Sequence, residues 1–312
     1  MPFPSALFKA KARQVLRNHW QTALLIALAV NLPSLLVQAV SSFAGTDPLM
    51  RLESVLVVAA RDGVLTQQYL ADSLQALLQD SGVVISLCCM VLAWLVTPCL
   101  ALGMTRWLLM RLRGEEGPFG TVFSRLNVSH KAIGLRLLIT LKVILWMLPG
   151  AALLFGGAWV LAGTVSGNAS SAMTGVTALS WAGMIAMAVP AVMAALRYAL
   201  ADILLADEPG KAVTACIRES KQMMNRRKGM LFSLELSFIF WYLGEMLVSS
   251  FLAGLGSGVL SLMFQMLAGL FLSVYMEASV CAFSEAVRKL PVASADTPTP
   301  GPEEEEPWFL YR

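Results

Sequence analysis

Carboxylates inside long apolar segments are the residues of this sequence best suited to do chemistry. Glu235, Glu245 and Glu277 each lie in such a segment, and Arg197 lies at the end of another. A charged group is costly in hydrocarbon, so it usually faces a bundle interior or water and often marks an ion or substrate path. The candidate intramembrane polar site is therefore Glu245, Glu235, Glu277 and Arg197. Glu245 is the deepest of these, and structural ion pairing is the favoured reading over transport. Possible partners of Glu235 and Glu277 are Arg197, Arg136 and Lys142.

No common catalytic or metal-binding motif occurs in the sequence. HExxH, G-x-S-x-G, a P-loop and a CxxC pair are all missing. His19 and His130 stand in basic stretches, where contact with lipid headgroups is commoner than catalysis. The five cysteines have neither metal-ligand spacing nor the placement of a structural disulfide. We expect a protein that is not an enzyme, with no cofactor, no metal ion and no nucleic-acid partner.

The composition places the candidate residues in a membrane protein. Of the 312 residues, 57% are hydrophobic and 14% are charged, which is too apolar for an ordinary soluble domain. A spanning helix needs about 20 apolar residues, and backbone groups in hydrocarbon must be paired within the segment. The sequence predicts an all-α, polytopic helix bundle within 21–290. The six predicted spans are 21–40, 82–105, 135–162, 176–200, 230–252 and 259–284.

Basic residues are distributed unevenly between the loops. Only Arg51 and Arg61 fall in the loop 47–80, whereas the other lysines and arginines all fall on the opposite side of the predicted bundle. The positive-inside rule then places both termini in the cytoplasm. We expect a bacterial inner-membrane protein whose outer loop 47–80 forms two short helices, with Thr66 capping the second.

Amphipathic stretches are predicted at the basic side. They cover 1–20, 118–130 and 208–228, and each precedes a predicted span. A helix that is apolar on one face and basic on the other is typical of a segment lying in the membrane interface.

The tail 291–312 is acidic and disordered by composition.

The stretch 208–228 is the clearest of these helices. Asp207 is predicted to cap it. Val213, Cys216 and Ile217 share one face, which we expect to enter the acyl boundary while the basic side chains reach the headgroups. Anionic lipid headgroups are therefore the expected partners, and protein partners are left open. The candidate contacts are Lys211, Arg218, Lys221, Arg226, Arg227 and Lys228.

An internal repeat relates two of these stretches. The segment 105–131 aligns with 196–222, so that Arg106 matches Arg197 and Pro118 matches Pro209. The amino terminus, starting near Pro4, is a weaker third copy. We predict three parallel units, each an interfacial helix followed by a transmembrane hairpin. Chance similarity between apolar segments is the alternative.

The sequence resembles a known family of bacterial integral membrane proteins, called domain of unknown function 975. The resemblance rests on "RYALADILLADEP", on Ser220-Lys221 with Met224, and on Leu236-Ser237-Phe238-Ile239 with Trp241. Phe240 replaces the usual glycine of that family. The resemblance covers about 10–290 and implies a multi-pass protein without an established activity. It transfers no catalytic residue.

Three functions remain open at this level. The first is a non-enzymatic factor associated with the membrane or its lipids. The second is a transporter of a small molecule or ion that uses intramembrane carboxylates on proline-kinked helices. The third is a membrane scaffold that docks cytoplasmic partners on the basic surface or the tail.

Overall fold

The structure, a computed structural model, describes residues 5–44, 51, 54–55, 67–164, 169–256 and 258–289. Within these residues every regular element is a helix, and six helices are long and apolar enough to cross a membrane. The prediction of an all-α bundle with six spans is therefore confirmed. The six are α2 (Trp20–Ala44), α5 (Ser81–Leu112), α6 (Ser129–Thr164), α7 (Ala169–Tyr198), α10 (Lys228–Gly254) and α11 (Gly258–Lys289).

Most of these helices are longer than the hydrocarbon layer requires. Helices of 25 to 36 residues measure about 38–54 Å at 1.5 Å per residue, against about 30 Å of hydrocarbon. They must tilt in the bilayer or extend beyond it. Four of them contain an internal proline, at positions 33, 98, 149 and 190.

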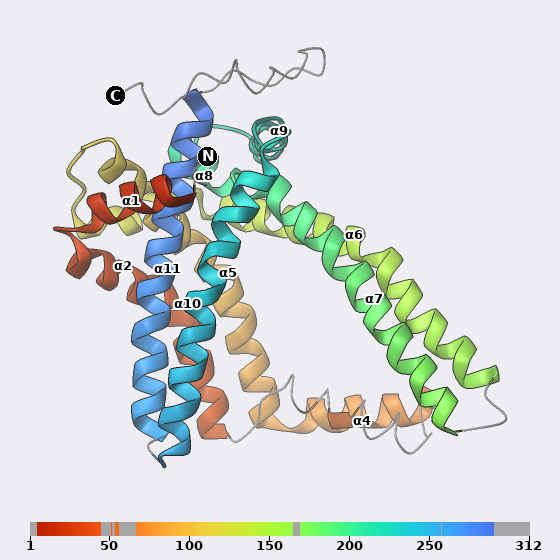
Figure 1. Cartoon of the computed structure of the whole chain (residues 1–312). Coiled ribbons are helices and arrows are strands. Elements are labelled where there is room, and N and C mark those ends of the chain that lie inside the picture. Colours follow the sequence, from red (N-terminus) through yellow and green to blue (C-terminus); the bar gives the residue numbers. More distant parts are fainter. Residues whose placement is uncertain are drawn as a thin grey trace.

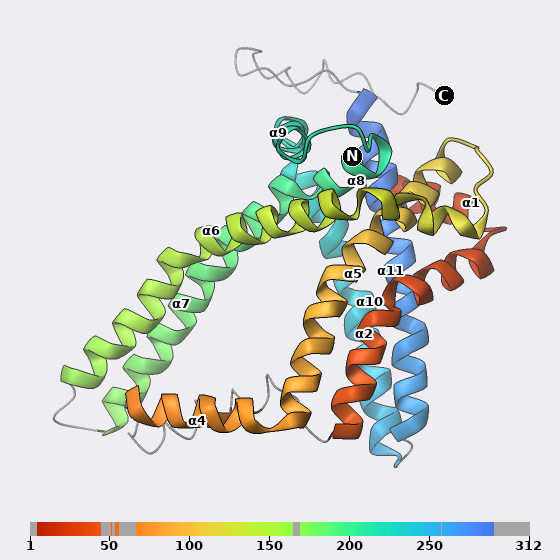
Figure 2. The same cartoon turned by 180° about the vertical axis from the view of Figure 1, so that it is seen from behind.

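The long helices form two groups (Figures 1 and 2). The pairs α2–α5 and α10–α11 stand together, with α11 touching both α2 and α5. The α6–α7 hairpin meets this group near one end of the molecule and leans away from it toward the other end. The helix α4 (Gln67–Gln79) lies across that other end, from the foot of α5 toward the tip of the hairpin. We call the end with α4 the α4 end and the opposite end, which holds most of the Lys and Arg, the basic end.

Four short helices lie at the basic end. They are α1 (Ser5–Leu16), the 3₁₀ helix η1 (Phe119–Val128), α8 (Ala201–Asp207) and α9 (Val213–Met223). The helix α1 runs across the bundle rather than along it (Figure 1). Its apolar side chains Phe8, Ala12 and Leu16 are buried, and Phe8 packs edge-on against Phe283 of α11 with ring centroids 5.4 Å apart.

The stretch predicted as a helix over 118–130 has a different geometry. It is a 3₁₀ helix, and α6 follows it directly at Ser129. The backbone of η1 lies against α5 at Gly103, where an added Cβ would be 1.8 Å from the Val122 carbonyl oxygen. Only a residue without a side chain fits there, so Gly103 sets how closely η1 approaches α5.

The prediction that the apolar face of 208–228 enters the lipid is wrong. The helix in this region, α9, is shorter, and it packs on α8, α6 and α7. Its apolar side chains are buried in these contacts, with Cys216 fully and Ile217 almost fully covered. Ser220, on the same face, donates a hydrogen bond to the Arg197 carbonyl at 3.1 Å. The face that the sequence marks as apolar is therefore a packing surface within the protein.

The order of elements follows the predicted three units. The chain runs α1–α2–α5, then η1–α6–α7, then α9–α10–α11, so a short amphipathic helix precedes two long helices each time. The two long helices of each unit pack against each other. The superposition of the three units stays a prediction. Thr66, most of the outer loop before Gln67, and the tail from residue 290 lie outside the described residues.

Candidate functional site

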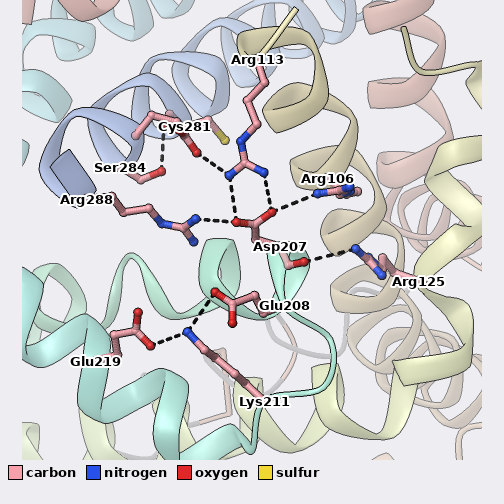
Figure 3. Close-up of polar contacts among 11 residues, drawn as sticks. Arg106, Arg113, Arg125, Asp207, Glu208, Lys211, Glu219, Cys281, Ser284 and Arg288 are labelled. Atoms are coloured by element: carbon pink, nitrogen blue, oxygen red, sulfur yellow. Dashed lines mark hydrogen bonds and ion pairs between the residues drawn. The ribbon is translucent and has the colours of Figure 1, made fainter. Parts of the chain in front are cut away.

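An ion-pair cluster around Asp207 joins the helices at the basic end (Figure 3). The Asp207 carboxylate accepts from both terminal nitrogens of Arg113, each at 2.8 Å, and from Arg106 Nη1 at 2.9 Å. Arg288 of α11 donates to the same carboxylate. The side chain of Asp207 is 10% exposed, whereas those of the three arginines are 22–31% exposed. One carboxylate thus links the end of α8 to the ends of α5 and α11.

A second carboxylate extends this Asp207 cluster. Glu285 of α11 accepts from Arg113 Nη2 at 2.7 Å. The hydrogen bonds that Arg113 donates to Asp207, together with Glu285, raise the pKa of the Arg113 guanidinium above its ordinary value. Arg125 of η1 donates to the Asp207 main-chain carbonyl at 3.5 Å. Bidentate arginine pairs of this kind fix orientation as well as charge, so the cluster aligns four elements.

The loop after Asp207 is held in the same way. Lys131 Nζ donates to the Pro209 carbonyl at 2.7 Å. Lys211 pairs with Glu219 at 2.8 Å and with Glu208 at 3.1 Å. The hydrogen bond that Lys211 donates to Glu219 raises the pKa of Lys211, and burial opposes this shift. These contacts hold the loop between α8 and α9 in place.

The prediction that Asp207 caps the following helix is wrong. Asp207 is the last residue of α8, and the residue before α9 is Ala212, which makes no side-chain cap. The carboxylate is engaged by arginines far away in the sequence instead. Of the expected headgroup contacts, Lys211 is occupied by two glutamates, and Arg226 and Arg227 take part in interactions within the chain. Arg218 and Lys221 are exposed, and Lys228 is half-buried.

A cavity of about 650 Å³ lies between α2, α5 and α11. Arg136 of α6 and Asp202 of α8 close it at the basic end. On α5 its wall runs from Met90 to Thr105, which is about 22 Å along the helix axis. Its apolar lining residues include Val30, Val37, Met90, Ala93, Trp94, Leu102 and Met276.

Polar groups concentrate at one end of this cavity. Thr105 Oγ1 donates to Glu277 Oε1 at 3.0 Å. Asp202 and Arg136 line the cavity with them. On the α2 wall, Asn31, Ser34 and Gln38 follow one another at helical spacing. The cavity therefore offers two carboxyl groups and one guanidinium at the basic end, and an apolar wall with a polar stripe farther in.

The structure does not bring the predicted polar site together. Glu277 lines the cavity. Glu245 lies against α11, where its Oε1 is 3.7 Å from the position that a Cβ on Gly269 would take. Glu235 is exposed. Among the described residues no ion pair joins these glutamates to Arg197, whose carbonyl accepts from Ser220.

The contacts of α1 with α10 and α11 mark the position along the bundle from which the apolar length extends toward the α4 end. Lys9 Nζ donates to the Ser237 carbonyl at 3.1 Å, and Tyr275 donates to the Lys9 carbonyl at 3.4 Å. From Phe238 to Gly254, α10 continues for 17 residues, or about 26 Å, which is close to the thickness of the hydrocarbon. Glu235 and Glu277 thus lie beyond this level toward the basic end, and only Glu245 lies within the apolar length.

Sequence reasoning missed the polar wall of the cavity on α2 and α5. Asn31, Ser34 and Gln38 are uncharged, so a search for charged residues passes over them. Their i, i+3, i+7 spacing on an otherwise apolar helix is the signal that points to one polar face. Thr105 carries no such signal, because its role depends on Glu277, 172 residues away.

Comparison with known proteins places the chain in a family. The family model described as "Protein of unknown function (DUF975)" matches residues 3–291, which is nearly the whole chain. No curated protein and no solved structure matches this chain. The expected family is thereby confirmed: the chain belongs to the DUF975 family of proteins of unknown function.

Proposed function

We propose that this protein is a non-enzymatic membrane factor that binds an amphiphile in the cavity between α2, α5 and α11. The membrane would be the bacterial inner membrane, with the basic end and both termini on the cytoplasmic side. The observation that carries the proposal is the division of the cavity into a charged end, with Asp202, Glu277 and Arg136, and a largely apolar length.

The dimensions of the cavity support a ligand of this kind. A volume of about 650 Å³ falls within the range of about 300–1,000 Å³ that is common for small-molecule sites. Carboxyl groups attract an amine, and a guanidinium attracts a phosphate or carboxylate. The cavity therefore suits an amphiphile with a zwitterionic head group and an acyl chain.

The test is to identify what the purified protein retains. Organic extracts of the wild type and of Ala101→Leu, which fills the cavity wall, are compared by mass spectrometry. Ala195→Leu is the matched control, because Ala195 is an exposed alanine on α7. We expect one amphiphile at near-stoichiometric amount in the wild type and the control. Ala101→Leu should lose it, and Glu277→Gln should retain less. Equal retention by Ala101→Leu and Ala195→Leu would refute the proposal.

A transporter that uses the same cavity is the second candidate. Pro98 lines the cavity in the middle of α5, and Pro33 lies in α2 next to the lining residue Ser34. A proline removes a backbone hydrogen bond and bends a helix, and broken helices can form transport sites. Flux of the retained amphiphile across proteoliposomes would favour transport. Binding without flux would favour the first candidate.

A further inference from the structure

A second cavity, of about 530 Å³, lies where α1 and the start of α2 meet α10 and α11. Arg13 of α1 and Arg17, which follows the end of that helix, form one wall, and Trp20 begins α2 beside them. Trp241 and Tyr275 come from α10 and α11. This arginine pocket is separate from the cavity of the proposed function, with which it shares no lining residue.

The charge of the arginine pocket is unbalanced. Arg13 lies in the last turn of α1, and Arg17 follows Leu16, the last residue of that helix. Both side chains line the pocket. The residues lining the pocket include no carboxylate. In the part of the chain that the structure describes, neither arginine forms an ion pair, in contrast to Arg106, Arg113 and Arg288 around Asp207. Arg13 interacts with Tyr275, but no carboxylate lines the pocket beside the two guanidinium groups. Such a pair is suited to bind an anion with several oxygens, such as a phosphate.

Aromatic rings form the opposite wall. Trp20 stacks on Phe271 with ring centroids 4.2 Å apart and planes 13° apart. Trp241 is 60% exposed and Phe271 is 43% exposed. Large aromatic side chains with one apolar and one polar edge concentrate where hydrocarbon meets headgroups. The pocket thus combines an anion-binding wall with an apolar wall that faces outward.

The position along the bundle brings this pocket to the bilayer boundary. The level of α1, set by the contacts of Lys9 with Ser237 and Tyr275, lies about one hydrocarbon thickness from the α4 end. Trp241 is four residues, or about one helical turn, farther into the apolar length than Ser237. A headgroup beside Arg13 and Arg17 would therefore leave its acyl chains next to Trp241 and Phe271.

We infer that the arginine pocket binds one anionic glycerophospholipid from the leaflet at the basic end. Arg13 and Arg17 hold the phosphate, and Trp20, Trp241 and Phe271 contact the start of the acyl chains. Basic pockets between transmembrane helices are known to select anionic headgroups in this way. The bound lipid would fasten the end of α1 and the start of α2 to α10 and α11.

Native mass spectrometry of the full chain in detergent tests this assignment. The probes are phosphatidylglycerol and phosphatidylcholine with identical acyl chains, added at equal concentration. We expect the wild type to retain one phosphatidylglycerol in preference to phosphatidylcholine. Arg13→Gln with Arg17→Gln should lower that preference about 10- to 30-fold, since each basic residue near an anionic headgroup contributes about a factor of five. The control is Lys11→Gln with Lys289→Gln, which removes two exposed cations outside the pocket and should keep the preference.

Other outcomes overturn the inference. Equal losses in both double variants would show a general surface-charge effect instead of a site. Displacement of the lipid by inorganic phosphate at millimolar concentration would assign the pocket to free phosphate. If the double variant does not purify, Arg13→Gln and Arg17→Gln are measured singly, and an unchanged preference in both refutes the site. Ala101→Leu should leave this preference intact, so that failure of the amphiphile cavity and failure of the arginine pocket are distinguishable.

Discussion

Arg113 binds Asp207 with both terminal nitrogens at 2.8 Å, although 94 residues separate them in the chain. Arg288 reaches the same carboxylate from α11. The pair stands at the centre of the basic end, where α5, α8 and α11 converge (Figure 3). Because a partly buried carboxylate balances three guanidinium groups, the arrangement depends on every member.

Removing the central carboxylate should therefore destabilise the protein. In Asp207→Asn, Arg106 and Arg288 lose the carboxylate with which they pair, and Arg113 keeps only Glu285. We expect a loss of about 2–3 kcal/mol, toward the low end for a buried pair because the arginines are partly exposed. The unfolding midpoint of the purified protein in detergent should fall by about 3–5 °C.

The control for Asp207→Asn is Glu116→Gln. Glu116 occupies the position of Asp207 in the internal alignment but is exposed. Its substitution should change stability by less than about 0.5 kcal/mol. Similar losses in both variants would show that the Asp207 cluster does not hold the helices together.

Gly103 should not tolerate a side chain. A Cβ there would lie 1.8 Å from the Val122 carbonyl oxygen and 2.5 Å from its carbon, so η1 must move away from α5. We expect Gly103→Ala to cost about 1–3 kcal/mol, as overpacking commonly does. Thermal unfolding in detergent measures the loss.

The matched substitution is Gly134→Ala. At Gly134, in α6, no atom lies within 4 Å of an added Cβ. Alanine there should be neutral or stabilising by up to about 1 kcal/mol, since it is the better helix former. If Gly103→Ala were equally well tolerated, the close approach of η1 would be absent.

Cys216 should be protected from water-soluble thiol reagents. It is fully buried on the face of α9 that packs on α8, and burial raises the pKa of its thiol. In a chain that keeps only Cys216, maleimide labelling at pH 8 should be on the order of 100-fold slower than for an exposed cysteine, which corresponds to about 2.7 kcal/mol of local opening. The reactive species is the thiolate, so the raised pKa also shifts the rise in labelling to higher pH.

The comparison for Cys216 is Thr214→Cys in a chain without other cysteines. Thr214 is exposed on the same helix, so both sites share the local sequence and the detergent environment. Equal labelling rates would mean that α9 does not pack on α8, and that its apolar face is open as the sequence alone suggested.

The proposed orientation can be tested in intact bacterial cells with a membrane-impermeant thiol reagent. Gln75→Cys on α4 should react without permeabilisation, because the α4 end would face outward. Arg218→Cys on α9 should react only after permeabilisation. Both residues are exposed. The reverse pattern would place the basic end outside and would contradict the positive-inside assignment.

Much of the architecture could be predicted from the sequence. Six apolar runs separated by polar loops become six helices, because hydrocarbon forces each spanning segment to pair its own backbone groups. The position of most basic residues at one end of the molecule could be predicted from the loops. The family could be predicted from sequence motifs. Each of these conclusions depends only on residues near one another in the chain.

The candidate site was less predictable. Asp207, preceding a proline and an amphipathic stretch, has the local signature of a helix cap, yet arginines 81 to 101 residues away bind it. The apolar face of α9 has the signature of an interfacial helix, but α8 covers it. Glu245 and Glu277 are both glutamates within apolar runs of the sequence, but only Glu277 lines the cavity.

The sequence by itself determined that six segments are long and apolar enough to cross a membrane, and which end of the molecule is basic. These properties follow from local hydrophobicity and charge, because each spanning segment must by itself be apolar and must pair its own backbone groups in the hydrocarbon. The predicted ends of these segments differ from the helix ends by up to seven residues. Only the tertiary structure decided which carboxylate meets which arginine, which apolar faces turn toward protein instead of lipid, and where the cavities lie. Those features depend on contacts between segments far apart in the chain, and many pairings of apolar helices satisfy the same sequence pattern.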